Sequence, residues 1–363
     1  MQEYAGSVVI RKYSKELGAV SWFHEDFEAQ EKEYLSRQRA TEEVYLKGPR
    51  RKNCILCLSD INEDRSFKIR GVLYSVCGNC EHINGMHDIT DEFLTFAYTT
   101  ELSTSNEEND LRPYSVEFTQ SKMSTNFERV VNDIYVPKAE FLLESLNKDT
   151  NVDCSGLTVL DFGCGSGHFV EALNRTGFSK VEGIDSLQSA VTQAQKHGLS
   201  AQISHTPIDA TENSLRRSGI DIVSMMCVLP HLTEPGKTIE LMRKSGIRWT
   251  FQKFPMWSFA LLLEAAMPNL RSRVIGADHT NAFTWKSVSW LEQNYGLRRV
   301  ATWSFGSDSL DFSRKIRANM RENSTNAFIN WATKSFTNLI EPLQSAIDLS
   351  ELSSELHVLW EIE

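Results

Sequence analysis

A chain of 363 residues with 41% hydrophobic and 24% charged residues has an ordinary globular composition, and its length favours two domains or one large domain with an appendage. Wholesale disorder is excluded, and because no apolar run reaches the roughly 20 residues of a bilayer span and no secretory leader is visible, we expect a cytoplasmic protein. A formal net charge of −10 argues against a surface built mainly to bind nucleic acid and favours small-molecule chemistry.

The first 125 residues contain a helix, a basic run and a small turn-rich segment. Apolar residues recur near helical spacing over 22–46, the run KGPRRK follows at 47–52, and alternation over 67–76 indicates a strand. A second helical pattern over 130–146 leads into the rest of the chain. We therefore expect an N-terminal helical segment at 1–50, a small module with its connection at 51–125, and a main domain at 126–363.

The main domain alternates buried strands with helices. Strand patterns at 157–162 and 180–185 are each followed by a helical pattern, and further strands are indicated at 201–206, 221–229 and 248–254. Two more strand patterns lie at 298–306 and 355–362. Strands that alternate with helices at this spacing predict an α/β fold, a parallel sheet with helices on both faces.

Four cysteines in the small module have the spacing of a zinc site. Cys54 and Cys57 form one C-x-x-C pair, Cys77 and Cys80 form another, and nineteen residues separate the pairs. Four thiolates suit tetrahedral Zn²⁺ and leave no open position for water, so we expect a structural metal ion. The ion would stabilise a segment that is too small to form a hydrophobic core.

The other potential metal ligands lack such spacing. His82 and His87 follow the second pair and are interpreted as solvated or neighbouring histidines rather than ligands. Cys154, Cys164 and Cys227 are interpreted as small buried residues.

The sequence VLDFGCGSGHF at 159–169 predicts a nucleoside-binding turn. A strand ends at Asp161, and Gly163, Gly165 and Gly167 precede a helix whose first amides favour an anionic group. The next strand closes with Asp185, where a carboxylate can accept hydrogen bonds from both ribose hydroxyls.

This G-x-G-x-G spacing, with the two acids, resembles the class I S-adenosylmethionine-dependent methyltransferases. The segments at 227–232 and 279–297 are similar to the family's segments after its fourth strand and before its sixth strand. With the cysteine pairs, the layout resembles bacterial methyltransferases that carry an N-terminal zinc-binding domain, among them sugar C-methyltransferases. One departure is FPMWSF at 254–259, which lacks the family's proline-asparagine turn.

The resemblance implies a Rossmann-like sheet of seven strands with the last strand antiparallel. It also implies that S-adenosylmethionine is the cofactor and that the following residues contact it: Asp161, Gly163, Gly165, Gly167, Asp185, Ser186, Asp209 and Cys227. Asp209 is the nearest candidate for the contact to adenine.

Methyl transfer to carbon or oxygen needs a base, and histidine titrates in the right range. His231 and His279 are the best-placed candidates, each with the alternative of a hydrogen-bonded structural role. Four aromatic residues are candidates for the wall of an acceptor pocket or for the core: Trp257, Phe259, Phe283 and Trp285.

Three functions stay open on the sequence. The first is methylation of a small molecule, such as a nucleotide-linked sugar or a natural-product intermediate. The second is methylation of RNA or protein, with the zinc module and the run at 47–52 as the recognition surface. The third is a reaction of S-adenosylmethionine without methyl transfer, such as a cyclisation. No membrane partner is expected, nucleic acid is disfavoured, and the sequence is silent on oligomeric state.

Overall fold

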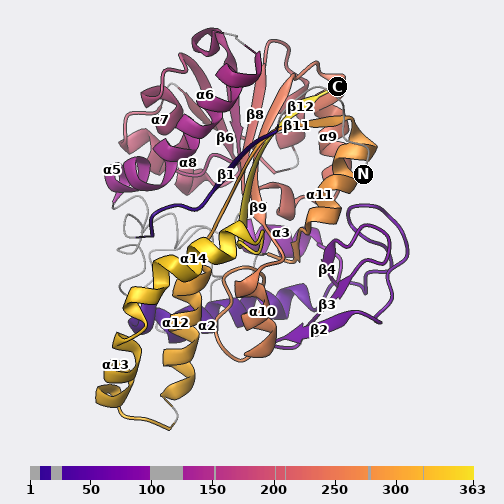
Figure 1. Cartoon of the computed structure of the whole chain (residues 1–363). Coiled ribbons are helices and arrows are strands. Elements are labelled where there is room, and N and C mark those ends of the chain that lie inside the picture. Colours follow the sequence, from indigo (N-terminus) through magenta and orange to yellow (C-terminus); the bar gives the residue numbers. More distant parts are fainter. Residues whose placement is uncertain are drawn as a thin grey trace.

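The computed structural model describes residues 9–17, 27–98, 126–150, 153–200, 202–208, 210–276, 279–321 and 323–363. An eight-stranded sheet lies at the centre of the upper half in Figure 1. From one edge to the other its strands are β1 (Ile10–Tyr13), β11 (Leu297–Phe305), β12 (Glu355–Ile362), β9 (Trp249–Pro255), β8 (Ile222–Met226), β5 (Thr158–Phe162), β6 (Lys180–Asp185) and β7 (Ile203–His205).

The sheet is parallel except for β12, which runs antiparallel to both β11 and β9. The α/β class, the mostly parallel order and the antiparallel last strand are thus confirmed. The expected count of seven strands is wrong, because β1 adds an eighth strand beside β11, with Ile10 opposite Ala301. The sequence signal for β1 is weak because the strand has only four residues and half of them are exposed.

Helices cover both faces of this sheet (Figure 1). On one face α6 (Val136–Thr150), α7 (His168–Arg175) and α8 (Gln188–Lys196) enclose one hydrophobic core. A short helix α5 (Phe127–Val130) and a short π-helix (Val131–Tyr135) lead into α6. On the other face α9 (Pro235–Lys244) and α11 (Trp285–Tyr295) enclose a second core. Short 3-10 helices lie at Cys154–Gly156, Thr211–Arg216, Leu229–His231 and Thr337–Leu339.

The cysteine-rich module folds around a four-stranded sheet. Its strands, in order, are β10 (Asn281–Ala282), β4 (Ile83–Gly85), β3 (Val72–Val76) and β2 (Ser66–Ile69). The single strand expected over 67–76 is a hairpin, because Arg70 and Gly71 both adopt positive φ, 46° and 95°, as a two-residue turn requires. Strand β10 comes from the main domain, so the two parts share one sheet.

A helical cap lies beyond the carboxyl ends of the parallel strands, in the lower half of Figure 1. It combines α2 (Phe27–Tyr45) and α3 (Asp91–Tyr98) with α10 (Phe259–Ala266), which follows β9. Between β11 and β12 the chain inserts α12 (Asp308–Met320), α13 (Asn326–Lys334) and α14 (Ile340–Leu349). Because β9 and β11 are parallel, both insertions leave the sheet at the same edge. Ligands of open α/β sheets bind at this edge.

No helix in the described ranges has the length and apolar character that crossing a bilayer demands.

Candidate functional site

The glycine turn after β5 adopts a backbone that only glycine accepts without strain. Gly163, Gly165 and Gly167 have φ of 75°, 54° and 82°. A Cβ added at Gly163 would lie 2.6 Å from the side chain of Val228, and one at Gly167 would lie 2.5 Å from Ile203. The turn is therefore packed so closely at Gly163 and Gly167 that a larger residue at either position would clash with these side chains.

Asp185, at the end of β6, is tied to this turn through its carboxylate. One oxygen accepts a hydrogen bond from the Gly165 amide at 2.7 Å, and the other accepts from the Leu187 amide at 2.8 Å. Burial raises the pKa of Asp185, against the opposing effect of these amides. Each carboxylate oxygen has a second lone pair, so the two oxygens can still accept from neighbouring hydroxyls. The arrangement fits recognition of a ribose.

Asp161, the last residue but one of β5, is a buried acid, and only one of its two carboxylate oxygens has a hydrogen-bond partner among the described residues. Its Oδ1 accepts from the Ser224 hydroxyl at 2.7 Å, and its Oδ2 has no partner among the described residues. Burial raises the pKa of Asp161 to about 7, and the nearby Asp185 adds to the effect.

The two candidate bases lie face to face beyond β8. The rings of His231 and His279 stack with centroids 4.8 Å apart and an angle of 15° between their planes. His231 ends the 3-10 turn after β8, whereas His279 belongs to the loop that precedes β10. Both side chains are half-buried, and the structure brings the two candidate rings together beyond β8.

Cys227 connects these histidines to the sheet. It adopts φ of 67°, which ends β8 at Met226 rather than at the expected residue 229. Its Sγ lies 2.9 Å from the Lys253 Nζ on β9. Burial acts to raise the pKa of Cys227, but the Lys253 ammonium and a hydrogen bond to His279 outweigh it and bring the pKa to about 7.

The remaining predicted positions are less informative. Ser186 is half-buried, and its carbonyl oxygen lies 3.1 Å from His205 Nε2. Asp209 lies outside the described residues. Phe283 is 1% exposed and packs on Phe254 in the core, whereas Trp257, Phe259 and Trp285 are half-buried.

The four cysteines of the two C-x-x-C pairs converge on one point. Their sulfur atoms all lie within 4.8 Å of one another, with Cys54 to Cys80 at 3.6 Å and Cys57 to Cys77 at 3.5 Å. Sulfurs bound at about 2.3 Å to a tetrahedral zinc ion stand about 3.8 Å apart. A disulfide is excluded because its sulfurs stand about 2 Å apart. The donor set therefore fits Zn²⁺.

Both cysteine pairs form the same turn. The Leu58 amide donates to the Cys54 carbonyl, and the Glu81 amide donates to the Cys77 carbonyl, at 3.0 Å each. Leu58 and Glu81 take φ of 60° and 59°, so the backbone curls around the sulfurs identically in the two pairs.

A short chain of hydrogen bonds joins this module to the candidate bases. The side-chain nitrogen Nδ2 of Asn281, in β10, donates to the Pro230 carbonyl at 2.5 Å, and the side-chain oxygen Oδ1 lies 3.1 Å from His82 Nε2. Because that oxygen only accepts, His82 donates, which fixes its tautomer. His82 is thus a buried positioning residue rather than a ligand, and His87 contacts the Gly48 carbonyl at 2.7 Å.

Sequence reasoning missed a charged cluster at the carboxyl edge of β9 and β12. Lys253 Nζ lies 3.3 Å from Glu355 Oε1, and the other members are Lys15, Lys138 and His357. The sequence sign of this cluster is a charged residue in each of two mostly buried strands, Lys253 in β9 and Glu355 in β12.

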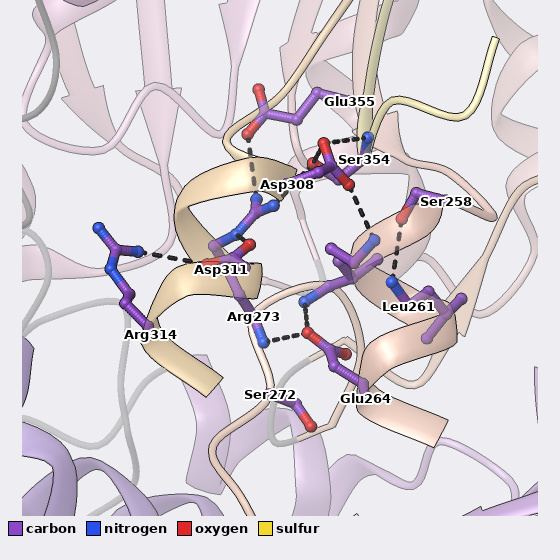
Figure 2. A network of polar contacts seen from close by, with 12 residues as sticks. Ser258, Leu261, Glu264, Ser272, Arg273, Asp308, Asp311, Arg314, Ser354 and Glu355 are labelled. Atoms are coloured by element: carbon purple, nitrogen blue, oxygen red, sulfur yellow. Dashed lines mark hydrogen bonds and ion pairs between the residues drawn. The ribbon is translucent and has the colours of Figure 1, made fainter. Parts of the chain in front are cut away.

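Arg273 links Glu355 to the cap (Figure 2). Its guanidinium lies 3.8 Å from Glu355 and donates to Asp311 of α12 at 2.5 Å and to the Ser354 hydroxyl at 2.7 Å. Glu264 of α10 accepts from the Arg273 amide at 2.6 Å. The segment that leads to His279 is therefore held between α10, α12 and the start of β12.

Residues 153–247 match a family model described as a methyltransferase domain. A ubiquinone biosynthesis O-methyltransferase of Paraburkholderia xenovorans is 31% identical over 153 residues, 39% of this chain and 63% of that protein. A protein with the same description from Rhodopseudomonas palustris is 36% identical over 162 residues, 42% of this chain and 62% of that protein. The chain thus spans less than two thirds of the length of these relatives.

Solved structures with a related arrangement are more distant in sequence. A magnesium protoporphyrin IX methyltransferase from Synechocystis PCC 6803, with bound S-adenosylhomocysteine, is 15% identical with a TM-score of 0.41. That match covers 69% of this chain and 95% of the other. The family model therefore matches the part of the chain from β5 to α9, which holds the glycine turn and Asp185.

Proposed function

We propose that the protein transfers a methyl group from S-adenosylmethionine to a small molecule. The observation that carries the proposal is the glycine turn hydrogen-bonded to Asp185, because this pair combines close backbone approach with a carboxylate whose second lone pairs can accept from ribose hydroxyls. The family match to a methyltransferase domain covers the same turn.

When bound, the cofactor supplies an electrophilic methyl group, and the residues of the chain position it and the acceptor. Asp185 accepts from the ribose hydroxyls, and Gly163 and Gly165 allow close contact. Asp161 lies two residues before Gly163, and one of its carboxylate oxygens has no partner among the described residues, so it is a candidate acceptor for a polar group of the cofactor. Ser186, Asp209 and Cys227 remain proposed contacts.

His279 is the proposed general base. Its side chain contacts Cys227 and stacks on His231 at the end of β8, the next strand to β5 in the sheet. From there it removes the proton of the acceptor hydroxyl or carbon, and His231 holds its ring in place. The named activity of the relatives, O-methylation in ubiquinone biosynthesis, supports a hydroxyl acceptor.

We further propose that Cys54, Cys57, Cys77 and Cys80 bind one structural zinc ion. The ion would hold together the module whose strand β4 pairs with β10. It would thereby keep the segment that carries His279 in place.

The alternative of a macromolecular acceptor has less support. In the run at 47–52, Lys47 pairs with Glu92 at 3.6 Å, Arg51 pairs with Asp88 at 3.4 Å, and Arg50 pairs with Glu63. Acidic partners neutralise much of the charge that would attract phosphates.

The experiment uses purified zinc-containing protein, S-adenosylmethionine with a labelled methyl group, and a panel of nucleotide-linked sugars and phenolic natural products. We expect label in one class of acceptor and an equal amount of S-adenosylhomocysteine. Methylthioadenosine as the product would indicate a cyclisation instead. Labelling of RNA or protein, but of no small molecule, would support the macromolecular alternative.

A further inference from the structure

A group of cations converges on the carboxyl edge of the sheet at some distance from the glycine turn. In the register of β12 and β9, His357 stands opposite Lys253 and Glu355 stands opposite Pro255. Residues opposite each other share a face of the sheet, so Lys253, His357 and Glu355 point to the same side. Helix α6 covers this side, since its Phe141 packs on Phe251 and Trp303.

Two further lysines approach from this covering layer and from the sheet edge. Lys138 of α6 is 6% exposed, and its Nζ lies 4.9 Å from the ring centre of Tyr135. Lys15, just after β1, donates to the Asp133 carbonyl at 2.6 Å. Burial lowers the pKa of Lys138 to about 7, Glu355 opposes this effect, and the ammonium groups of Lys253 and Lys15 add to it. The Lys138 ammonium therefore lies within electrostatic reach of the ammonium groups of Lys253 and Lys15.

Positive charge exceeds negative charge in this cluster. The acidic groups in contact with it are Glu355, which is shared between Lys253 at 3.3 Å and Arg273 at 3.8 Å, and the Cys227 thiol, 2.9 Å from Lys253. The Asp133 carboxylate, at the margin, is paired with Arg129. Among the described residues the Lys138 ammonium has no ion-pair partner. An unpaired buried ammonium is costly unless an anion joins it.

His357 is a second and independent sign of a ligand. It is fully buried, and neither of its ring nitrogens has a hydrogen-bond partner in the described part of the chain. Its ring stacks on Phe305 with centroids 4.7 Å apart, which fixes its orientation. Buried polar atoms normally have partners, so an unsatisfied ring in a cationic cluster indicates a missing one. The cluster is not sealed, since the Lys253 and Glu355 side chains are 17% and 22% exposed.

The position of the cluster separates it from the nucleoside site. Asp185 lies on β6, and β12 lies four strands away in the order β12-β9-β8-β5-β6. At about 4.8 Å per strand the two sites are roughly 19 Å apart. Cys227 and the candidate base His279 lie between them, on the side of β8.

We propose that Lys15, Lys138, Lys253 and His357 form a binding pocket for an oxyanion, a phosphate or carboxylate, carried by the methyl acceptor. This inference rests on the proposed function, and it narrows the substrate class to small molecules with an anionic group. In this arrangement the pocket anchors the acceptor at one end and leaves its reacting atom near His279.

The test titrates inorganic phosphate into the full-length protein by calorimetry at constant ionic strength, with and without saturating S-adenosylhomocysteine. We expect phosphate to bind both forms with affinities within about twofold of each other. Lys138→Gln and Lys15→Gln should each weaken phosphate binding roughly tenfold or more, because each removes a charged donor to the anion. Lys148→Gln, an exposed position on the same helix, should change nothing.

The control for folding is thermal unfolding without phosphate. Lys138→Gln should be at least as stable as the wild type, since it removes an uncompensated buried charge. If phosphate and S-adenosylhomocysteine compete, and Lys138→Gln weakens S-adenosylhomocysteine, the pocket holds the cofactor's carboxylate and the acceptor assignment is overturned. The absence of phosphate binding in a protein that binds S-adenosylhomocysteine would also overturn it. Phosphate binding without any S-adenosylhomocysteine binding would leave the pocket standing and refute the proposed function.

Discussion

Loss of the metal site should loosen residues 279–284, the segment that holds the candidate base His279, without unfolding the main sheet. Cys77→Ser removes one of the four sulfurs, and zinc binding contributes on the order of 10–16 kcal/mol to small structural sites. The module is joined to this segment by the Gly85 amide to the Thr280 carbonyl at 2.8 Å, by His82 to Asn281 at 3.1 Å, and by the register of β4 with β10.

The expected magnitude follows from these links. Two hydrogen bonds and the short strand pairing, at about 1 kcal/mol each, amount to about 3 kcal/mol, which is roughly 100-fold in a local opening equilibrium. Hydrogen exchange by mass spectrometry should therefore show about 100-fold faster exchange in peptides that cover 82–86 and 279–284, with little change in β5 and β6.

The matched control is Cys154→Ser, which alters a buried cysteine outside the cluster. It should keep about one zinc per chain and normal exchange at 279–284. Wild-type protein that contains no metal and yet protects these peptides as well as the zinc-loaded form would refute the reasoning.

Three further predictions concern the nucleoside site and the base. Asp185→Ala should weaken S-adenosylhomocysteine binding by about 1–3 kcal/mol in calorimetry, whereas Glu182→Ala on the same strand, paired with Arg217 at the surface, should not. His279→Ala should lower turnover roughly 10²–10⁴-fold, and more than His231→Ala does, with cofactor affinity unchanged; equal turnover in all variants would remove both histidines as bases. Because the pKa of Asp161 is raised from 3.8 to about 7, its stabilising effect is complete below pH 4 and lost as pH rises through 7. Asp161→Asn should therefore flatten the dependence of unfolding free energy on pH in this window and gain a few kcal/mol at pH 8; an unchanged pH profile would contradict the assignment.

Much of the core sheet could be predicted from local sequence. Strands β6 and β12 begin and end at the expected residues, because each is a mostly buried run bounded by turn residues. Strand β8 stops three residues early, since the left-handed backbone at Cys227 turns the chain away from the sheet. The glycine turn and the cysteine pairs were recognisable because their chemistry depends on short spacings.

Features assembled from distant segments could not be predicted in this way. The pairing of β1 with β11 joins residues about 290 positions apart, and four residues provide little periodicity. The cationic pocket takes Lys15, Lys138, Lys253 and His357 from four separate elements, and each is an ordinary charged or polar residue in its own sequence context. The cap was missed as a unit because its helices come from both sides of the boundary expected at residue 125.

The measurement that tests the central claim most directly is a calorimetric titration of the zinc-loaded, full-length protein with S-adenosylhomocysteine. The site built from the glycine turn and Asp185 predicts one binding site per chain, competition by S-adenosylmethionine, and a loss of affinity in Asp185→Ala. A folded protein that binds neither compound at millimolar concentration would contradict a methyltransferase function for this chain.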